Sequence, residues 1–275
     1  MNILNTLLLG IIQGLTEFLP VSSSGHLILA QTFMGTGMDS EAVGSAMLLE
    51  AVLHVGTAIA VVWVFRKDIL GIIRGCVSKD VVVRKDSLTY SGWVIIATIP
   101  AAVIGILFKK HIDLLFDTSR GDMAAYIAAF MLFVTAALLF ATLLKKGDGG
   151  KLTIATVVII GLMQAIAIAP GISRSGSTIA IALLIGVSRE EAGRFSFMLA
   201  LPAIFGAALL DVRKAGALEP EMLLSLAVGL VASFIVGIIA LKWLLAFIKR
   251  GKLHYFGYYC AGVAVVSLVG LSFRG

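Results

Sequence analysis

Two polar runs, rich in serine and glycine, interrupt long apolar stretches of this 275-residue chain. They are Pro20-Val21-Ser22-Ser23-Ser24-Gly25-His26 and Pro170-Gly171-Ile172-Ser173-Arg174-Ser175-Gly176-Ser177-Thr178. Hydroxyl groups can hydrogen-bond an anion, and glycines leave backbone N–H groups within its reach. Small residues also serve helix packing in membranes, which is the alternative role for any one of them. The candidate phosphate-binding residues are Gln13, Ser22, Ser24, Gly25, Gly171, Ser173, Ser175, Gly176 and Thr178.

Three ionisable residues lie in or beside these runs. Glu17 follows Gln13 by four residues, so both would face the same way on a helix. A carboxylate inside an apolar stretch is by default a functional hypothesis. His26 could act as a general base or proton shuttle. The guanidinium of Arg174 suits two-pronged recognition of phosphate oxygens, and a structural ion pair with Glu17 is a compatible alternative.

Together these groups suit a phosphate ester or anhydride as substrate. Phosphoryl transfer depends mostly on positioning and charge stabilisation. A serine hydroxyl could attack phosphorus while His26 or Glu17 takes its proton. A single arginine offers little positive charge for a diphosphate, so we expect a divalent cation, Mg²⁺ or Ca²⁺, to assist. The sequence contains neither an H-E-x-x-H zinc motif nor a P-loop lysine motif.

The composition is that of an integral membrane protein. Hydrophobic residues make up 59% of the chain and charged residues only 14%, whereas soluble domains carry about 25% charged residues. The net charge of +6 therefore indicates basic cytoplasmic loops rather than a nucleic-acid partner. No cleavable signal peptide is predicted, and the two cysteines do not resemble a disulfide or metal pair.

Hydropathy predicts an all-α polytopic fold in a single membrane domain, residues 1–275. Apart from the expected transmembrane helices, two apolar regions contain the polar runs. Their short apolar arms favour re-entrant helical hairpins, with re-entrant loops at about 13–30 and 164–187. The alternative is that both hairpins span fully, which would give eight helices. The six expected transmembrane helices cover about 46–65, 92–108, 124–144, 195–210, 222–248 and 254–272.

The chain also repeats itself. The two polar regions align without a gap at an offset of 151, so that Gln13 matches Gln164 and Gly25 matches Gly176. The matches are polar residues and glycines, which are more informative in an apolar chain than matched leucines. We therefore predict two repeats, at about 1–123 and 152–275.

Loop charge predicts how the repeats are oriented. If both hairpins re-enter, the loops 66–91, 145–151, 188–194 and 249–253 share one side and hold 14 Lys and Arg, against 6 on the opposite side. The positive-inside rule makes the first side cytoplasmic. The hairpins then enter from opposite faces, as in inverted-topology repeats, whose sites tend to lie near the membrane midplane.

The two runs resemble the signatures of a known family. The segment from Gln13 to His26 resembles the first signature of the bacterial undecaprenyl-diphosphate phosphatases, the bacitracin-resistance family, and the segment from Pro170 to Thr178 resembles the second. Their order and spacing, the chain length and the hydrophobic layout also fit, so the resemblance covers essentially the whole chain.

This resemblance implies a hydrolase that converts undecaprenyl diphosphate to undecaprenyl phosphate and inorganic phosphate. That reaction recycles the carrier lipid for peptidoglycan and other envelope polymers and confers bacitracin resistance. The resemblance implies an inner-membrane location and a pocket open to the periplasm. It also implies that Ser23 and His26 are the nucleophile and base, that Glu17 handles a metal ion or a proton, and that Arg174 holds phosphate.

Several points stay open at this stage. The family has Glu or Gln at its first position, and Gln13 here shifts the weight onto Glu17. A transporter or flippase for a polyprenyl phosphate is the second hypothesis, because broken helices in inverted repeats are common in transporters. Whether Ser23 or water attacks, whether the chain forms a homodimer, and whether Glu50, four residues before His54, contributes to the site are not decided.

Overall fold

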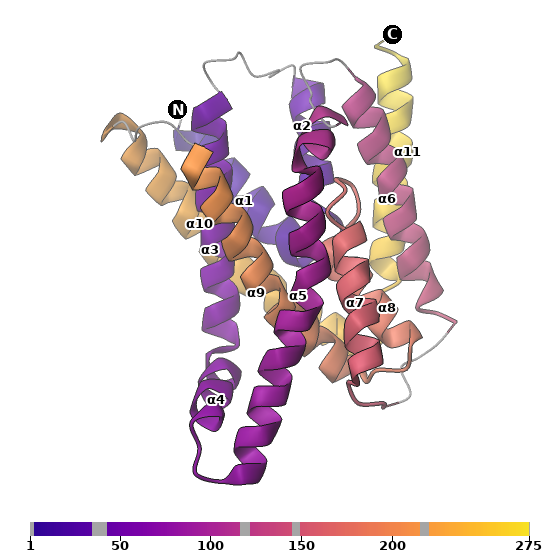
Figure 1. Ribbon diagram of the computed structural model, residues 1–275. Coiled ribbons are helices and arrows are strands. Elements are labelled where there is room, and N and C mark those ends of the chain that lie inside the picture. The colour runs from indigo at the N-terminus through magenta and orange to yellow at the C-terminus, as the bar shows by residue number, and fades with distance from the viewer. Residues whose placement is uncertain (1–2, 35–42, 116–121, 145–148, 215–219, 275) are drawn as a thin grey trace.

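The computed structural model describes residues 3–34, 43–115, 122–144, 149–214 and 220–274 (Figure 1). Within these ranges all regular structure is helical, apart from a single bridge between Gly150 and Val187. The all-α class is therefore confirmed. The helices are α1 (Ile3–Phe18), α2 (Ser23–Met34), α3 (Val43–Val64), α4 (Arg66–Cys76), α5 (Val81–Leu115), α6 (Met123–Ala141), α7 (Ile154–Ile166), α8 (Arg174–Leu184), α9 (Arg189–Lys214), α10 (Pro220–Lys249) and α11 (Tyr255–Ser272).

Five of the described helices are long and apolar enough to cross a membrane, and a bent pair would add a sixth. The bent pair is α3 and α4, whose axes differ by 72°. The chain is accordingly a multi-pass membrane protein. The candidate spans of the five single helices are Val81–Phe108, Met123–Ala141, Arg189–Leu209, Met222–Lys249 and Tyr255–Ser272.

Two segments that hydropathy predicts as loops are largely helical. Residues 66–91 form α4 and the first turns of α5, and the segment 188–194 contains the start of α9. The prediction was wrong because hydropathy marks only the apolar part of a helix, and polar turns extend beyond it. In α4, Asp68 in the first turn and Arg74 in the last turn complement the helix dipole. Asp68 also pairs with Arg194 of α9 at 2.8 Å.

Besides α4, four of the described helices are too short to span a membrane alone. The helices α1, α2, α7 and α8 have 16, 12, 13 and 11 residues, and a spanning helix needs about 20. They form two antiparallel pairs, α1 with α2 and α7 with α8, each joined by one of the polar runs. Figure 1 shows the tips of both pairs toward the middle of the molecule and their open ends at opposite ends of it.

Each hairpin is held by glycine contacts with a long helix from the other half of the chain. A Cβ atom on Gly10 of α1 would lie 2.7 Å from the carbonyl oxygen of Gly229 in α10. A Cβ atom on the matching Gly161 of α7 would lie 2.7 Å from the carbonyl oxygen of Ala97 in α5. Larger residues would push these backbones apart. Helix α1 therefore packs on α10, and α7 packs on α5.

Buried aromatic rings fix the end of α1, where the first polar run begins. The ring of Phe18 is fully buried and meets that of Phe197 in α9 edge-on, with 6.0 Å between ring centroids. Phe65, at the bend between α3 and α4, also packs on Phe197, with 6.0 Å between ring centroids. Because Phe18 is adjacent to Glu17, this packing also restricts where the carboxylate can point.

Candidate functional site

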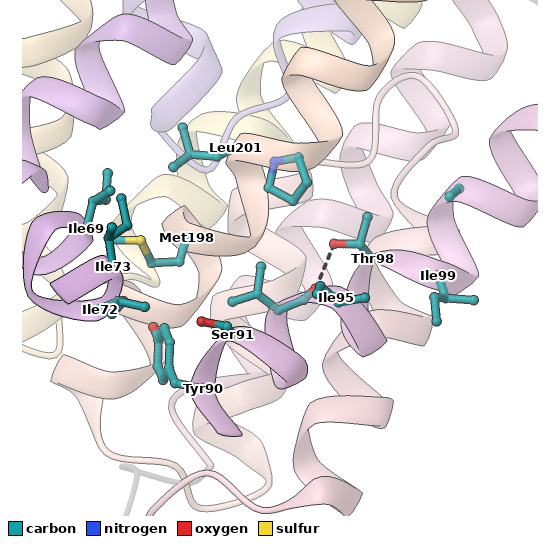
Figure 2. Close-up of a pocket in the computed structure, with 13 residues that line it drawn as sticks. Ile69, Ile72, Ile73, Tyr90, Ser91, Ile95, Thr98, Ile99, Met198 and Leu201 are labelled. Carbon is teal, nitrogen blue, oxygen red and sulfur yellow. Dashed lines mark hydrogen bonds between the residues drawn. The ribbon is translucent and has the colours of Figure 1, made fainter. Parts of the chain in front are cut away.

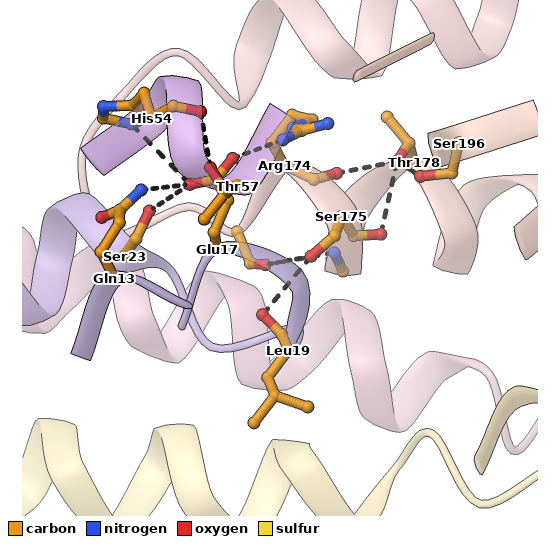
Figure 3. A network of polar contacts seen from close by, with 12 residues as sticks. Gln13, Glu17, Leu19, Ser23, His54, Thr57, Arg174, Ser175, Thr178 and Ser196 are labelled. Atoms are coloured by element: carbon orange, nitrogen blue, oxygen red, sulfur yellow. Dashed lines mark hydrogen bonds and ion pairs between the residues drawn. The ribbon is translucent and has the colours of Figure 1, made fainter. Parts of the chain in front are cut away.

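The carboxylate of Glu17 is the centre of a polar network that joins both hairpins (Figure 3). Its Oε1 accepts a hydrogen bond from Nη2 of Arg174 at 2.6 Å. Its Oε2 accepts from Nε2 of Gln13 at 3.1 Å and from Oγ of Ser23 at 3.0 Å. Only 8% of the Glu17 side chain is exposed. One nearly buried carboxylate thus has both oxygens bound to groups that the sequence singled out.

Gln13 and Glu17 are brought together by helix geometry alone. They lie one turn apart on α1, and the expected contact between residues i and i+4 is present. Gln13 is almost fully buried, and its Oε1 has no hydrogen-bond partner among the described residues. A buried acceptor without a partner is uncommon in native structures. It leaves one oxygen beside Glu17 available for a ligand.

Arg174 is placed by the cap of α8. Ser173 is the N-cap residue, and its Oγ accepts from the backbone N–H of Gly176 at 3.1 Å. The N–H of Ser173 donates to Oγ1 of Thr135 in α6, and that hydroxyl donates to the carbonyl of Gly171. Arg174 therefore starts α8 from a fixed loop. Its Nη2 binds Glu17, while its Nη1 is buried without a partner in the described part of the chain.

Ser22 holds the first polar run in shape. Its φ is +68°, a left-handed conformation that costs a residue with a side chain about 1–3 kcal/mol. Its Oγ accepts from the N–H of Gly25 at 3.3 Å and from the N–H of Gly171 at 3.1 Å. The second of these bonds crosses from one hairpin to the other. The hydroxyl of Ser22 is therefore used to join the two loops.

The two loops approach each other through matched glycines. A Cβ atom on Gly25 would lie 2.8 Å from the Cα of Gly171, and one on Gly176 would lie 3.0 Å from the Cβ of Pro20. Pro20 and Gly171 are themselves matched at the offset of 151, as are Gly25 and Gly176. The helices α2 and α8, which begin at Ser23 and Arg174, therefore start close together. Helix N-termini carry unpaired N–H groups and attract anions.

His26 and Ser23 hydrogen-bond to different partners. Nδ1 of His26 lies 2.8 Å from the carbonyl oxygen of Ser22, and Nε2 lies 3.0 Å from the hydroxyl of Tyr259 in α11. The hydroxyl of Ser23 donates to Glu17 instead. These two described residues form no hydrogen bond with each other, and Glu17 is the acceptor of the Ser23 hydroxyl. The assignment of Ser23 and His26 as nucleophile and base stays a prediction.

The other predicted hydroxyls bind within the loops and helices. Oγ of Ser175 contacts the carbonyl of Leu19 at 3.4 Å, and Oγ1 of Thr178 lies 2.6 Å from Oγ of Ser196 in α9. Oγ of Ser24 lies 3.5 Å from that of Ser22. These contacts hold the loop arrangement together. Their roles in phosphate binding stay predictions.

The network includes residues that sequence reasoning missed. Nε2 of His54 in α3 lies 3.8 Å from Oε2 of Glu17. Nδ1 of His54 contacts the backbone carbonyl of Glu50 at 2.8 Å, so the contact of Glu50 with this histidine is made by its main chain. A histidine within an apolar stretch was the only signal for His54. Thr135 and Tyr259 gave none, because they belong to helices distant in sequence.

An apolar pocket lies apart from this network, between α4, α5 and α9 (Figure 2). Its volume is about 470 Å³. The hydroxyls of Ser91 and Thr98 on its wall donate to carbonyls of their own helix, those of Ser87 and Val94. The pocket therefore offers almost only hydrocarbon to a neighbouring molecule, as expected of a surface within the bilayer.

A divalent cation would find oxygen ligands at Glu17. Mg²⁺ in phosphate-processing sites is held by one or two carboxylates together with substrate phosphates. The carboxylate of Glu17 and the unpartnered Oε1 of Gln13 fit this pattern. Within the described residues no three His, Cys, Asp or Glu side chains gather as a metal cluster. These residues fit a cation whose other ligands come from the substrate.

Comparison with known proteins identifies the family of this chain. The profile of the family described as "Bacitracin resistance protein BacA" matches residues 6–266. A relative from Korarchaeum cryptofilum, named undecaprenyl-diphosphatase, is 42% identical and aligns over 98% of this chain and its own full length. Relatives of the same name from Desulfatibacillum aliphaticivorans and Methanobrevibacter smithii are 42% and 39% identical, over 98% of this chain and 99% and 98% of theirs. The chain belongs to the bacitracin resistance protein BacA family.

Proposed function

We propose that this protein is an undecaprenyl-diphosphate phosphatase. It hydrolyses the phosphoanhydride of undecaprenyl diphosphate and releases inorganic phosphate and undecaprenyl phosphate, the carrier lipid that peptidoglycan synthesis uses again. The observation that carries the proposal is the carboxylate of Glu17, which binds the attacking-group candidate Ser23 and the phosphate-binding candidate Arg174 at the same time. The names of the relatives support the same reaction.

The arginine can serve both the carboxylate and a phosphate. Nη2 of Arg174 is bound to Glu17, which fixes the plane of the guanidinium. Nη1 is buried without a partner in the described part of the chain, so it can donate to an oxygen of the terminal phosphate without breaking the ion pair. The N-termini of α2 and α8 add positive potential on the same anion.

The proton of Ser23 already points at its acceptor. Oγ of Ser23 donates to Oε2 of Glu17 at 3.0 Å. As Oγ forms a bond to the terminal phosphorus, the bridging P–O bond breaks and its electron pair leaves with undecaprenyl phosphate, while the serine proton passes to Glu17. Water then attacks the phosphoserine and releases inorganic phosphate, while Glu17 returns the proton to the oxygen of Ser23. Direct attack by water would use the same acceptor.

A divalent cation, Mg²⁺ or Ca²⁺, belongs to this proposal. The carboxylate of Glu17 and Oε1 of Gln13 would hold the cation. When bound, the cation would neutralise charge on the diphosphate. Gln13 lacks the charge of a second carboxylate, so its oxygen can approach the cation without repelling Glu17.

We also propose the membrane arrangement that the sequence predicts: six transmembrane helices and two re-entrant hairpins in inverted repeats. The reciprocal glycine contacts support it, because Gly10 with Gly229 and Gly161 with Ala97 are pairs that a twofold relation between the repeats would produce. We propose, as the family resemblance implies, a location in the bacterial inner membrane with the site open to the periplasm. Loop charge supports the assignment of the cytoplasmic side. Homodimer formation stays a prediction.

Replacing the candidate nucleophile tests the proposal. A diphosphatase with the Ser23→Ala change should lose phosphate release, because no hydroxyl remains beside Glu17, while Ser91→Ala in the apolar pocket should leave release unchanged. Both variants and the wild type are purified in detergent and assayed with undecaprenyl diphosphate. A polyprenyl-phosphate carrier would keep its lipid flux in both variants. Wild-type phosphate release by Ser23→Ala would exclude Ser23 as the nucleophile and would indicate direct attack by water.

A further inference from the structure

The last helix of the chain contacts the first polar run through an aromatic pair. Tyr259 of α11 lies 233 residues after His26, and its hydroxyl is 3.0 Å from Nε2 of the imidazole. The two ring planes are nearly parallel, at 6°, with centroids 5.6 Å apart. The neighbouring residue, Cys260, also contacts this run through Sγ, 3.6 Å from the carbonyl of Pro20. Helix α11 thus touches the first run at two places.

The contacts of His26 define its tautomer. A carbonyl oxygen only accepts hydrogen bonds, so the 2.8 Å contact with the Ser22 carbonyl requires a proton on Nδ1. In the neutral imidazole the lone pair is then on Nε2, where the hydroxyl of Tyr259 can donate to it. Both ring nitrogens are satisfied in this state. Loss of the tyrosine hydroxyl would leave Nε2 without this partner and remove one of the two hydrogen bonds that hold the ring.

The hydrogen bond from His26 to the Ser22 carbonyl holds the loop at the tip of the first hairpin, and this loop contacts the second hairpin. Ser22 has a left-handed backbone, and its Oγ receives the N–H groups of Gly25 and Gly171. Gly171 in turn is tied through Thr135 to the cap that starts α8 at Arg174. A continuous series of hydrogen bonds therefore runs from Tyr259 through His26 and Ser22 to the loop that places Arg174.

We propose that Tyr259 is a positioning residue for the reaction and acts through His26. The proposal rests on the phosphatase function above. Tyr259 holds the His26 ring in the orientation that donates to the Ser22 carbonyl, and that bond keeps Ser23 and Arg174 in register on Glu17. In this arrangement the lone pair of His26 is used by Tyr259. His26 therefore works as a hydrogen-bond donor to the loop, and Glu17 receives the proton of Ser23.

Kinetics of Tyr259→Phe test this role against a matched neighbour. The change keeps the ring and removes only the hydroxyl, so kcat should fall about five- to tenfold, the value of one hydrogen bond, with KM unchanged. Tyr258→Phe is the control, because that ring packs edge-on against Phe140 at 4.8 Å and lies beside Tyr259 in sequence. An equal loss in both variants would mean a general effect on α11 and would overturn the proposal.

A double-mutant cycle tests whether Tyr259 acts through His26. With His26 replaced by Asn, Tyr259→Phe should cause no further loss, because the partner of the hydroxyl is already gone. Independent and multiplicative losses would contradict the proposed route.

A spectroscopic measurement separates this proposal from the phosphatase function. Side-chain ¹⁵N NMR of the histidines in detergent, with His26 assigned by its substitution, should show a protonated Nδ1 and an unprotonated Nε2 in the wild type. Tyr259→Phe should move the Nε2 resonance, because Nε2 loses its hydrogen-bond donor, and Tyr258→Phe should leave it in place. An unchanged spectrum in Tyr259→Phe would refute the role of Tyr259. This signature would persist even if the protein released no phosphate.

Discussion

Glu17 and Arg174, 157 residues apart, form an ion pair of 2.6 Å that joins the two hairpins of the chain. The pair is nearly buried, with 8% of the Glu17 side chain and 16% of the Arg174 side chain exposed. Ion pairs of this kind contribute less to stability than their distance suggests, because both charges lose water. Their value here is positional, since the pair fixes the Arg174 guanidinium beside the carboxylate that accepts the hydrogen bond of Ser23.

Removing the charge of Glu17 should stop the reaction. Glu17→Gln keeps the shape of the side chain but cannot accept a proton, so kcat should fall by about 10²–10⁴, the range of general-base catalysis. The matched control is Glu50→Gln, an exposed residue of α3 whose main chain makes the contact with His54. Phosphate release from undecaprenyl diphosphate is measured for both. Turnover of Glu17→Gln within tenfold of the wild type would exclude Glu17 as the acceptor.

Close contact between the two loops should make Gly25 intolerant of a side chain. A methyl group would lie 2.8 Å from the Cα of Gly171, where backbone cannot move cheaply, so Gly25→Ala should destabilise the protein by about 1–3 kcal/mol. Gly262→Ala in α11, where no atom lies within 4 Å, should instead be neutral or stabilising, because alanine favours helices. Thermal unfolding midpoints in detergent decide the matter. Equal midpoints would show that the loops do not pack this closely.

Phosphate release should require a divalent cation, and binding of that cation should depend on Gln13. Chelator should lower phosphate release, and added Mg²⁺ or Ca²⁺ should restore it. Gln13→Leu removes the free oxygen beside Glu17 and should raise the Mg²⁺ concentration needed for half-maximal activity. Gln164→Leu, which changes the matched buried residue of the second hairpin, should leave that concentration unchanged. Phosphate release that is unchanged by chelator would contradict the cation requirement. Equal Mg²⁺ dependence in the two variants would contradict the role of Gln13.

The sequence predicted the main polar groups of the site because they sit in two short runs. The spacing of Gln13 and Glu17 predicted their contact on α1, and an ion pair between Glu17 and Arg174 was one of the expected alternatives. Both are confirmed. Multi-pass all-helical architecture followed from composition, because the bilayer leaves few other choices for so apolar a chain.

Other features depend on tertiary structure and could not be predicted. His54 and Tyr259 reach the runs from α3 and α11, and only folding brings those helices near them. The pairing of Ser23 with His26 is not seen because the imidazole bonds back to the carbonyl of Ser22, four residues earlier, and faces α11. The helices within residues 66–91 were not predicted because hydropathy does not distinguish polar helical turns from loops.

The most direct test of the account is phosphate release from undecaprenyl diphosphate by the purified wild type and by Arg174→Ala, in detergent with Mg²⁺. The wild type should release one phosphate per lipid and leave undecaprenyl phosphate. Arg174→Ala, confirmed as folded by its unfolding midpoint, should be slower by about 10²–10³, as expected when a charged stabiliser of the transition state is lost. No release by the wild type, with or without the cation, would contradict the proposed function, and near-normal release by Arg174→Ala would contradict the site.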